Sequence, residues 1–252
     1  MSEKRKKSPR IGIDDTHVRG REKQEKVLLW LSEYHYSTIS ILSRALGVNS
    51  VGQWAFFKRL IDAGLLRKID VPTVKEKLFL MTRDGRELAC ELTEKALDYV
   101  TEPSKVSVPI VRHNLCVQLA VLERLKPGIA HTFEKHLCFT DKDKLPDALL
   151  ESEGRATALE IELSHKRTNR VYRAFFDHIR GMKDKHYFDV EYVFSSASLR
   201  NNYQAKFDAI EWPVIERRDG RLRQSEKTFK PDSVAGLRER FSFVVQDFNA
   251  KK

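Results

Sequence analysis

Cysteine is scarce in this sequence, and long hydrophobic runs are missing from it. The 252 residues include three cysteines, an odd number without Cys-x-x-Cys spacing, which argues against a disulfide framework and against a zinc site. Cys90, Cys116 and Cys138 stand beside apolar residues, so we expect buried thiols in a reducing cytoplasm. No apolar run approaches the roughly 18 residues of a membrane span. The N-terminus, MSEKRKKSPR, lacks the apolar stretch of a secretory signal.

Positive charge, in contrast, is abundant. The chain has 46 Lys and Arg against 36 Asp and Glu, a net charge of +10. An excess of this kind favours a polyanionic partner, either nucleic acid or an anionic membrane surface. Because no membrane segment is found, we expect the partner to be double-stranded DNA. The composition of residues 1–20 predicts a disordered basic arm. This arm either lies along the phosphates of a nucleic acid or is a solvated tail.

The first hundred residues contain three helical patterns in close succession. A 3.6-residue apolar period predicts a helix from Arg21 to about His35. A short second helix and a longer third helix follow, each preceded by Ser, Thr or Asn residues that can cap it. The third helix would turn these apolar side chains inward: Val51, Trp54, Phe57, Leu60 and Ile61.

A pair of short strands and a further helix complete this region. The segment LLRKIDVPTVKEKLFLMT predicts two strands about a charged turn, and TRDGRELACELTEKAL predicts a helix. Residues 21–99 therefore resemble a winged helix-turn-helix domain, on the strength of LIDAGLLRKI leading into the wing and LFLMTRDGREL leaving it. The resemblance implies DNA binding. The alternatives are a solvated surface or protein contacts.

Two groups of polar side chains are the candidates for DNA contact. Gln and Ser can contact base edges, whereas Lys and Arg can hold phosphates. The third helix offers Ser50, Gln53, Lys58 and Arg59. The wing offers Arg67, Lys68, Lys75 and Lys77.

A linker is predicted at residues 100–109, VTEPSKVSVP, which has two prolines and no helical period. Residues 109–252 then predict the order helix, three strands, helix, strand, helix, strand, with WPVIERR as the last strand. We therefore expect an α/β (α+β) protein with an N-terminal winged helix and a C-terminal domain built on a central mixed sheet.

Acidic residues gather in the C-terminal domain despite the basic composition of the chain. "PD" on one predicted strand and "ExE" on the next, followed by a lysine, resemble the PD-(D/E)xK nuclease superfamily. The resemblance implies that Asp147, Glu160 and Glu162 hold Mg²⁺ or Mn²⁺ and that Lys166 assists catalysis. Carboxylate oxygens suit these ions, and residues two apart on a strand share a face. The sequence departs from the pattern because Glu162 stands where the lysine is usual.

Further polar residues are weaker candidates for the same site. His113 begins the first helix of this domain, where packing or capping is the alternative, and Glu123 lies later on that helix. Arg167 and Arg170 are candidate phosphate contacts. Tyr172 is either a nucleophile or a half-buried helix tyrosine.

A winged helix followed by a PD-(D/E)xK core, with the segment from Leu145 to Lys166, resembles the replication-relaxation group and the MobC-type mobilisation relaxases of plasmids. The resemblance implies a metal-dependent endonuclease that nicks DNA at an origin of transfer, with an accessory mobilisation or coupling protein as partner. No His cluster typical of the histidine-triad relaxases occurs.

Two alternative functions are kept beside the nicking enzyme. One is a non-catalytic DNA-binding regulator of plasmid replication or transcription, in which the nuclease fold serves only binding or homodimer formation. The other is a restriction-type endonuclease that cuts both strands and shares the same acidic residues.

Overall fold

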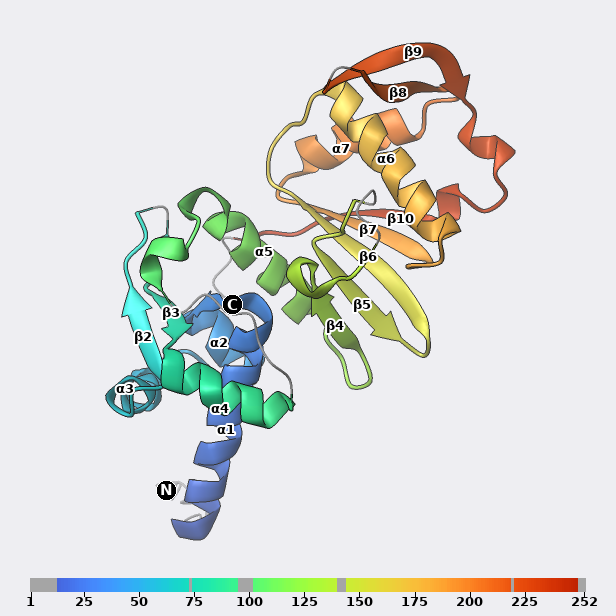
Figure 1. Cartoon of the computed structure of the whole chain (residues 1–252). Coiled ribbons are helices and arrows are strands. Elements are labelled where there is room, and N and C mark those ends of the chain that lie inside the picture. The colour runs from blue at the N-terminus through green and yellow to red at the C-terminus, as the bar shows by residue number, and fades with distance from the viewer. Residues whose placement is uncertain (1–12, 73, 95–101, 140–143, 219, 249–252) are drawn as a thin grey trace, which may run out of the picture. The chain divides into compact units, whose positions relative to one another are not determined.

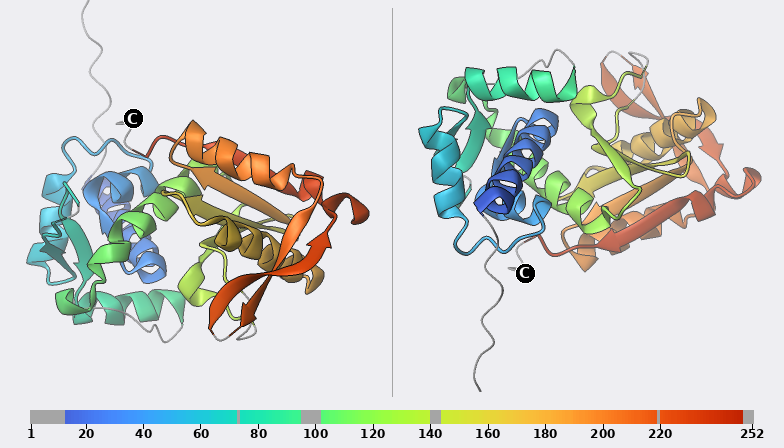
Figure 2. Two further views of the ribbon diagram at one scale, coloured as in Figure 1. Left: turned by 90° about the horizontal axis from the view of Figure 1, so that it is seen from above. Right: turned by 90° about the horizontal axis from the view of Figure 1, so that it is seen from below.

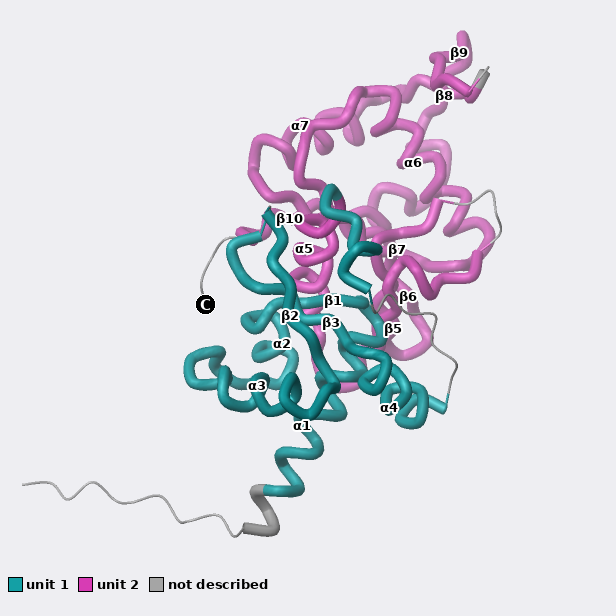
Figure 3. The backbone as a smooth tube through the Cα atoms, turned by 60° about the vertical axis from the view of Figure 1, so that its left-hand side comes forward, with its two compact units in different colours: residues 1–109 teal, residues 110–252 magenta. Residues whose placement is uncertain are grey.

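The computed structural model describes residues 13–72, 74–94, 102–139, 144–218 and 220–248 (Figure 1). The chain divides into two compact units, residues 1–109 and 110–252 (Figure 3). Among the described residues, no helix has both the length and the apolar character that a membrane crossing requires.

The N-terminal unit is a winged helix. Its elements are α1 (Ile13–Tyr34), β1 (Tyr36–Thr38), α2 (Ile39–Ala45), α3 (Trp54–Asp62), β2 (Leu66–Ile69), β3 (Leu78–Met81) and α4 (Arg83–Thr93). The three strands pair antiparallel in the order β1-β3-β2. The wing, residues 70–72 and 74–77 among those described, joins β2 to β3, and all four residues of β3 are buried.

Local sequence explains where α2 and α4 begin. Thr38 caps α2, because its hydroxyl accepts from the backbone N–H of Ile41. Thr82 caps α4 in the same way, accepting from the N–H of Gly85 at 3.1 Å. A Cβ at Gly85 would stand 2.1 Å from the carbonyl oxygen of Leu65, so only glycine lets α4 lie this close to the end of the α3–β2 connection.

Three expectations for this unit are wrong in detail. Helix α1 begins at Ile13, so residues 13–20 are helical and not a disordered arm, while residues 1–12 lie outside the described residues. Helix α3 begins at Trp54, because the side chain of Asn49 accepts from the N–H of Val51 and forms a turn there. Val51 and Trp54 are consequently 82% and 46% exposed instead of inward. Strand β1, three residues long, had no predicted counterpart.

The C-terminal unit contains a five-stranded mixed sheet. Its elements are α5 (Val108–Arg124), β4 (Ala130–Phe133), β5 (Ala148–Ser152), β6 (Arg155–Glu162), α6 (Thr168–Lys183), β7 (Asp189–Phe194), α7 (Ala197–Phe207), β8 (Trp212–Arg218), β9 (Arg221–Phe229) and β10 (Phe241–Val245). The strand order is β10-β7-β6-β5-β4, so β6 is central. Strand β6 pairs antiparallel with β5 and parallel with β7.

Aromatic packing places α6 and α7 over one face of this sheet (Figure 1). Phe175 of α6 and Tyr203 of α7 both pack against Tyr192 of β7, with ring centroids 5.9 and 5.8 Å apart respectively. Helix α5 covers the opposite face. Its Arg124 binds Glu191 of β7, and the side chains of Glu191 and Tyr192 point to opposite faces because they are neighbours on a strand. The sheet is therefore covered on both faces.

The end of the chain differs from the expected order. The segment WPVIERR forms β8, but β8 pairs with β9 as a separate two-stranded ribbon beside α6 (Figure 2). The fifth strand of the central sheet is β10, which lies parallel to β7. The expected strand after α5 is also shorter, because residues 134–136 form a 3₁₀ turn. Of the three cysteines expected to be buried, Cys116 is buried, Cys90 is half-buried and Cys138 is exposed.

Candidate functional site

The register of β5 and β6 brings the three predicted acids to one region. Ala148, the first residue of β5, pairs with Leu159, so Asp147 falls opposite Glu160 as the antiparallel register continues. Glu160 and Glu162 lie two residues apart at the C-terminal end of the central strand. The side chain of each is 3% exposed. Glu160 faces the α6 side, because it contacts His178 of that helix.

Asp147 is held by two donors that differ in kind. One carboxylate oxygen accepts from the backbone N–H of Ile161 at 2.7 Å. The other lies 3.0 Å from Nε2 of His113 on α5. Burial alone would lower the pKa of His113, but the hydrogen bond and the negative charge of Asp147 raise it. The carboxylate of Asp147 therefore makes this imidazole easier to protonate than an isolated histidine.

Glu160 has two cationic or potentially cationic neighbours. The ammonium of Lys144 contacts Oε1 of Glu160, and Nε2 of His178 lies 3.3 Å from the same oxygen. Burial alone would raise the pKa of Glu160, but Lys144 and His178 together lower it to about 2. Glu160 is thus an ionised carboxylate inside the protein, paired with the ammonium of Lys144 and contacted by the imidazole of His178.

His178 is oriented by a hydrogen bond on its other ring nitrogen. Its Nδ1 lies 2.9 Å from the hydroxyl of Tyr187, and its side chain is fully buried. Burial and the charge of Lys144 lower the pKa of His178. A neutral imidazole satisfies both contacts when Nε2–H donates to Glu160 and Nδ1 accepts from Tyr187.

Glu162 is paired separately. Its Oε1 lies 2.6 Å from Nζ of Lys166, four residues later in the loop that leads into α6. Burial raises the pKa of Glu162, and the charge of Lys166 opposes that rise. The predicted lysine therefore does reach the acidic residues, although it contacts Glu162 and not Glu160.

Whether a divalent cation fits here depends on which side chains already contact these three carboxylates. Three carboxylates on neighbouring strands are a suitable donor set for Mg²⁺ or Mn²⁺. Each is engaged, however: Asp147 by His113, Glu160 by Lys144 and Glu162 by Lys166. Within the described residues, no three His, Cys, Asp or Glu side chains are grouped as metal ligands. In this arrangement the residues do not fit a metal, because an ammonium group stands at Glu160.

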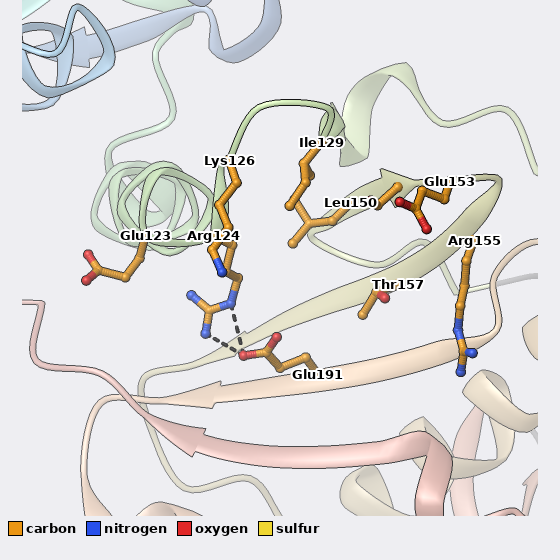
Figure 4. Close-up of a pocket in the computed structure, with 10 residues that line it drawn as sticks. Glu123, Arg124, Lys126, Ile129, Leu150, Glu153, Arg155, Thr157 and Glu191 are labelled. Atoms are coloured by element: carbon orange, nitrogen blue, oxygen red, sulfur yellow. Dashed lines mark hydrogen bonds and ion pairs between the residues drawn. The ribbon is translucent and has the colours of Figure 1, made fainter.

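The weaker candidates lie in different places. Tyr172 is 6% exposed and packs in the aromatic core, its ring centroid 6.1 Å from that of Phe175. Arg167 and Arg170 are exposed at the start of α6. Glu123 belongs to a separate cavity of about 600 Å³ that also contains the Arg124–Glu191 pair (Figure 4). That cavity lies on the α5 side of the sheet, so Glu123 does not join the acids that face α6.

Lys144 and His178 were not predicted as site residues. Lys144 precedes the "PD" pair in a charged turn, and residues 140–143 of that turn lie outside the described residues. His178 follows an aromatic run on α6, where its spacing resembles that of any buried helix residue. One signal was present in the sequence: His178 stands three residues after Phe175 and four before Met182, and is thus a polar residue on the otherwise apolar face of a helix.

The predicted DNA contacts lie on α3, on the turn before it and on the wing. Ser50 and Gln53 are half-buried in the turn before α3, whereas Lys58 and Arg59 are exposed on the helix. Two of the predicted cations are paired: Lys58 contacts Asp62 at 2.7 Å, and Lys77 contacts Asp70 at the base of the wing. The others, Arg67 and Lys68 on β2 and Lys75 on the wing, are exposed.

A groove between α1 and the start of α3 adds further basic residues. This cavity of about 330 Å³ is lined by Arg19 and Lys23 of α1 together with Gln53 and Arg59. No ion pair joins Arg19, Lys23 or Arg59 to an acid in the described part of the chain. Neither α1 residue was predicted as a DNA contact: Arg19 fell within the predicted disordered arm, and Lys23 lay on a predicted helix that no sequence pattern connected to DNA.

The wing is fixed to α2 by a hydrogen-bonded carboxylate. Glu76 accepts from both the backbone N–H of Ser40 at 3.2 Å and its hydroxyl at 2.8 Å. The ammonium of Lys68 lies 4.9 Å from the ring centroid of Trp54, within the range of a cation–π contact. These contacts position the basic residues of the wing and of β2 beside α3.

No protein-family profile and no curated protein matches this sequence. Among solved structures, the adhesin competence repressor AdcR from Streptococcus pyogenes is 18% identical, with 45% of this chain and 78% of AdcR covered and a TM-score of 0.27. Reduced AbfR bound to DNA is 19% identical over 44% of this chain and 89% of AbfR, with a TM-score of 0.27. AbfR with its disulfide formed is 21% identical, with 44% of this chain and 86% of AbfR covered and a TM-score of 0.25. Scores this low carry no functional argument, and the winged-helix assignment rests on the element order and sheet pairing described above.

Proposed function

We propose that this chain is a DNA-binding regulator of replication or transcription, in which the N-terminal unit binds duplex DNA through α3 and the wing. The observation that carries the proposal is the set of exposed cations on these elements. Arg59, Arg67 and Lys75 have no ion-pair partner among the described residues. Unpaired arginine and lysine side chains can bind phosphates without first breaking a salt bridge, and α3 is the element that enters the major groove in winged helices.

In this proposal the C-terminal unit is a non-catalytic scaffold. Two of the carboxylates that a nuclease would need, Glu160 and Glu162, are buried and paired with Lys144 and Lys166 respectively. Buried, paired charges of this kind are compatible with a structural role, because the pairing offsets their desolvation. The unit would then serve binding or homodimer formation.

Fluorescence anisotropy with labelled duplex DNA tests the proposal. The variant Arg67→Ala/Lys68→Ala removes two exposed cations of β2, and we expect binding to weaken and the slope of log Kd against log salt to fall by about 2. Arg83→Ala/Arg86→Ala is the matched control, because it removes two exposed cations from α4 of the same unit. Equal losses in both variants would mean that net charge alone drives binding and would refute a role for β2 and the wing.

A second candidate is a metal-dependent endonuclease of the relaxase type that nicks one strand at an origin of transfer. The position of Asp147 opposite Glu160, at the C-terminal end of the central strand and with Lys166 nearby, favours it. This candidate requires Lys144 to leave Glu160 before a cation can bind.

The two candidates differ in their products. The nicking enzyme converts supercoiled plasmid that carries its origin to open circles with Mg²⁺ or Mn²⁺, and Asp147→Asn abolishes the conversion. Linear product would indicate a restriction-type enzyme instead. The regulator leaves the plasmid supercoiled and binds it equally with or without metal.

A further inference from the structure

Lys144 occupies an unusual position for a lysine. Its side chain is 29% exposed, yet its nitrogen is shielded from solvent and contacts Glu160, whose side chain is 3% exposed. The aliphatic stem thus reaches inward from the surface and places the positive charge in the interior. Burial alone would lower the pKa of Lys144, but the charges of Glu160 and Asp147 raise it, so the amine is an ammonium ion.

Acidic side chains outnumber the cations around this ammonium. Asp147, Glu160 and Glu162 contribute three negative charges, and the nearby Glu134, whose pKa is raised by burial and by the charges of Asp147 and Glu160, adds a fourth when it is ionised. Lys144 and Lys166 contribute two positive charges, and His113, at 3.0 Å from Asp147, adds another when it is protonated. Three neighbouring carboxylates, of which Glu160 and Glu162 are buried, would repel one another strongly without such cations, and the usual solution is a metal ion or a shared proton.

We propose that Lys144 is a built-in counter-ion for Asp147 and Glu160, whose ammonium holds the position at these carboxylates that a divalent cation would otherwise take. The acidic centre is therefore stable without metal. The loop that carries Lys144 supplies the charge that the resemblance to metal-dependent nucleases assigns to Mg²⁺ or Mn²⁺. His178 supports this arrangement by contacting the same oxygen of Glu160 that Lys144 contacts.

The inference predicts that removing the amine creates a metal site. Lys144→Met keeps the stem and removes the charge, which leaves Glu160 beside Asp147 without its ammonium partner. In chelator, we expect the melting temperature of this variant to fall by on the order of 10 °C. Mn²⁺ should restore part of the loss, because the ion replaces the ammonium.

The experiment uses the full-length chain and counts bound Mn²⁺ from the loss of the free-ion signal in electron paramagnetic resonance, with thermal unfolding measured in parallel. Four proteins are compared: the wild type, Asp147→Asn, Lys144→Met and Lys144→Met/Asp147→Asn. We expect the wild type and Asp147→Asn to bind equal amounts of Mn²⁺. Lys144→Met should bind one ion more than the double variant.

Two results would overturn the proposal. One is a Mn²⁺ ion bound by the wild type and lost in Asp147→Asn, which would show that a metal binds although Lys144 is present. The other is a folded Lys144→Met protein that binds no additional ion. If Lys144→Met does not fold, the proposal is still tested by comparing the Mn²⁺ bound by the wild type with that bound by Asp147→Asn. DNA binding by the N-terminal unit is measured in a separate experiment. A chain that does not bind DNA would refute the proposed function but would not change the Mn²⁺ result.

Discussion

Glu160 is buried in the C-terminal unit, and its carboxylate contacts both Lys144 and His178. The substitution Glu160→Gln keeps the size of the side chain but removes its charge. Lys144 would then hold an ammonium whose nitrogen is shielded from solvent and has lost its main partner, and His178 would lose an acceptor. Breaking a buried pair from one side costs about 3–5 kcal/mol. We therefore expect the free energy of unfolding to fall by about that amount.

A variant that lacks both charges shows how much of this loss comes from the unpaired ammonium. Glu160→Leu/Lys144→Met removes both charges and replaces them with apolar side chains. Because such replacements are often neutral or stabilising, we expect the double variant to be more stable than Glu160→Gln by at least about 2 kcal/mol. Urea unfolding followed by circular dichroism measures both. A Glu160→Gln protein within about 1 kcal/mol of wild type would refute the account, because it would mean that Lys144 is not held by this carboxylate.

Two further predictions concern the neighbours of this pair. In Gly181→Ala, the new Cβ would stand 2.3 Å from the hydroxyl oxygen and 2.6 Å from Cζ of Tyr187, so the tyrosine ring must move away from His178. We expect the free energy of unfolding, measured in urea, to fall by about 1–3 kcal/mol. An unchanged free energy of unfolding would contradict this packing. His113 has a folded-state pKa raised above 6.5, so its contact with Asp147 stabilises the protein fully below pH 6.5 and loses its effect as pH rises through the folded pKa. Wild type should therefore lose more stability than His113→Asn between about pH 6 and 8, and parallel losses would contradict this.

Local patterns predicted the winged helix and the position of the acids. The capping residue Thr38, the strand pair about the wing and the helix after Thr82 are all set by neighbours within a few positions. The alternation of β6 likewise placed Glu160 and Glu162 on one face, because side chains two apart on a strand point the same way.

Long-range pairings were beyond the reach of the sequence. Lys144 lies 16 positions before Glu160 in the sequence, and His178 lies 18 positions after it. The periodicity of a helix or a strand does not predict contacts between residues so far apart. The fifth strand of the sheet, β10, was not anticipated because its pairing with β7 joins segments about 50 residues apart. The exposure of Val51 and Trp54 was missed for a local reason, since the turn at Asn49 delays the start of α3.

Hydrogen–deuterium exchange of the full chain, with and without duplex DNA, tests most directly whether the N-terminal unit is the DNA-binding surface. DNA should slow exchange in α3 and in the wing, because these elements carry the unpaired cations, and should leave the strands β5 and β6 unchanged. Slower exchange confined to β5, β6 and the loop before α6 would contradict the account, because it would place the nucleic acid at the acidic centre.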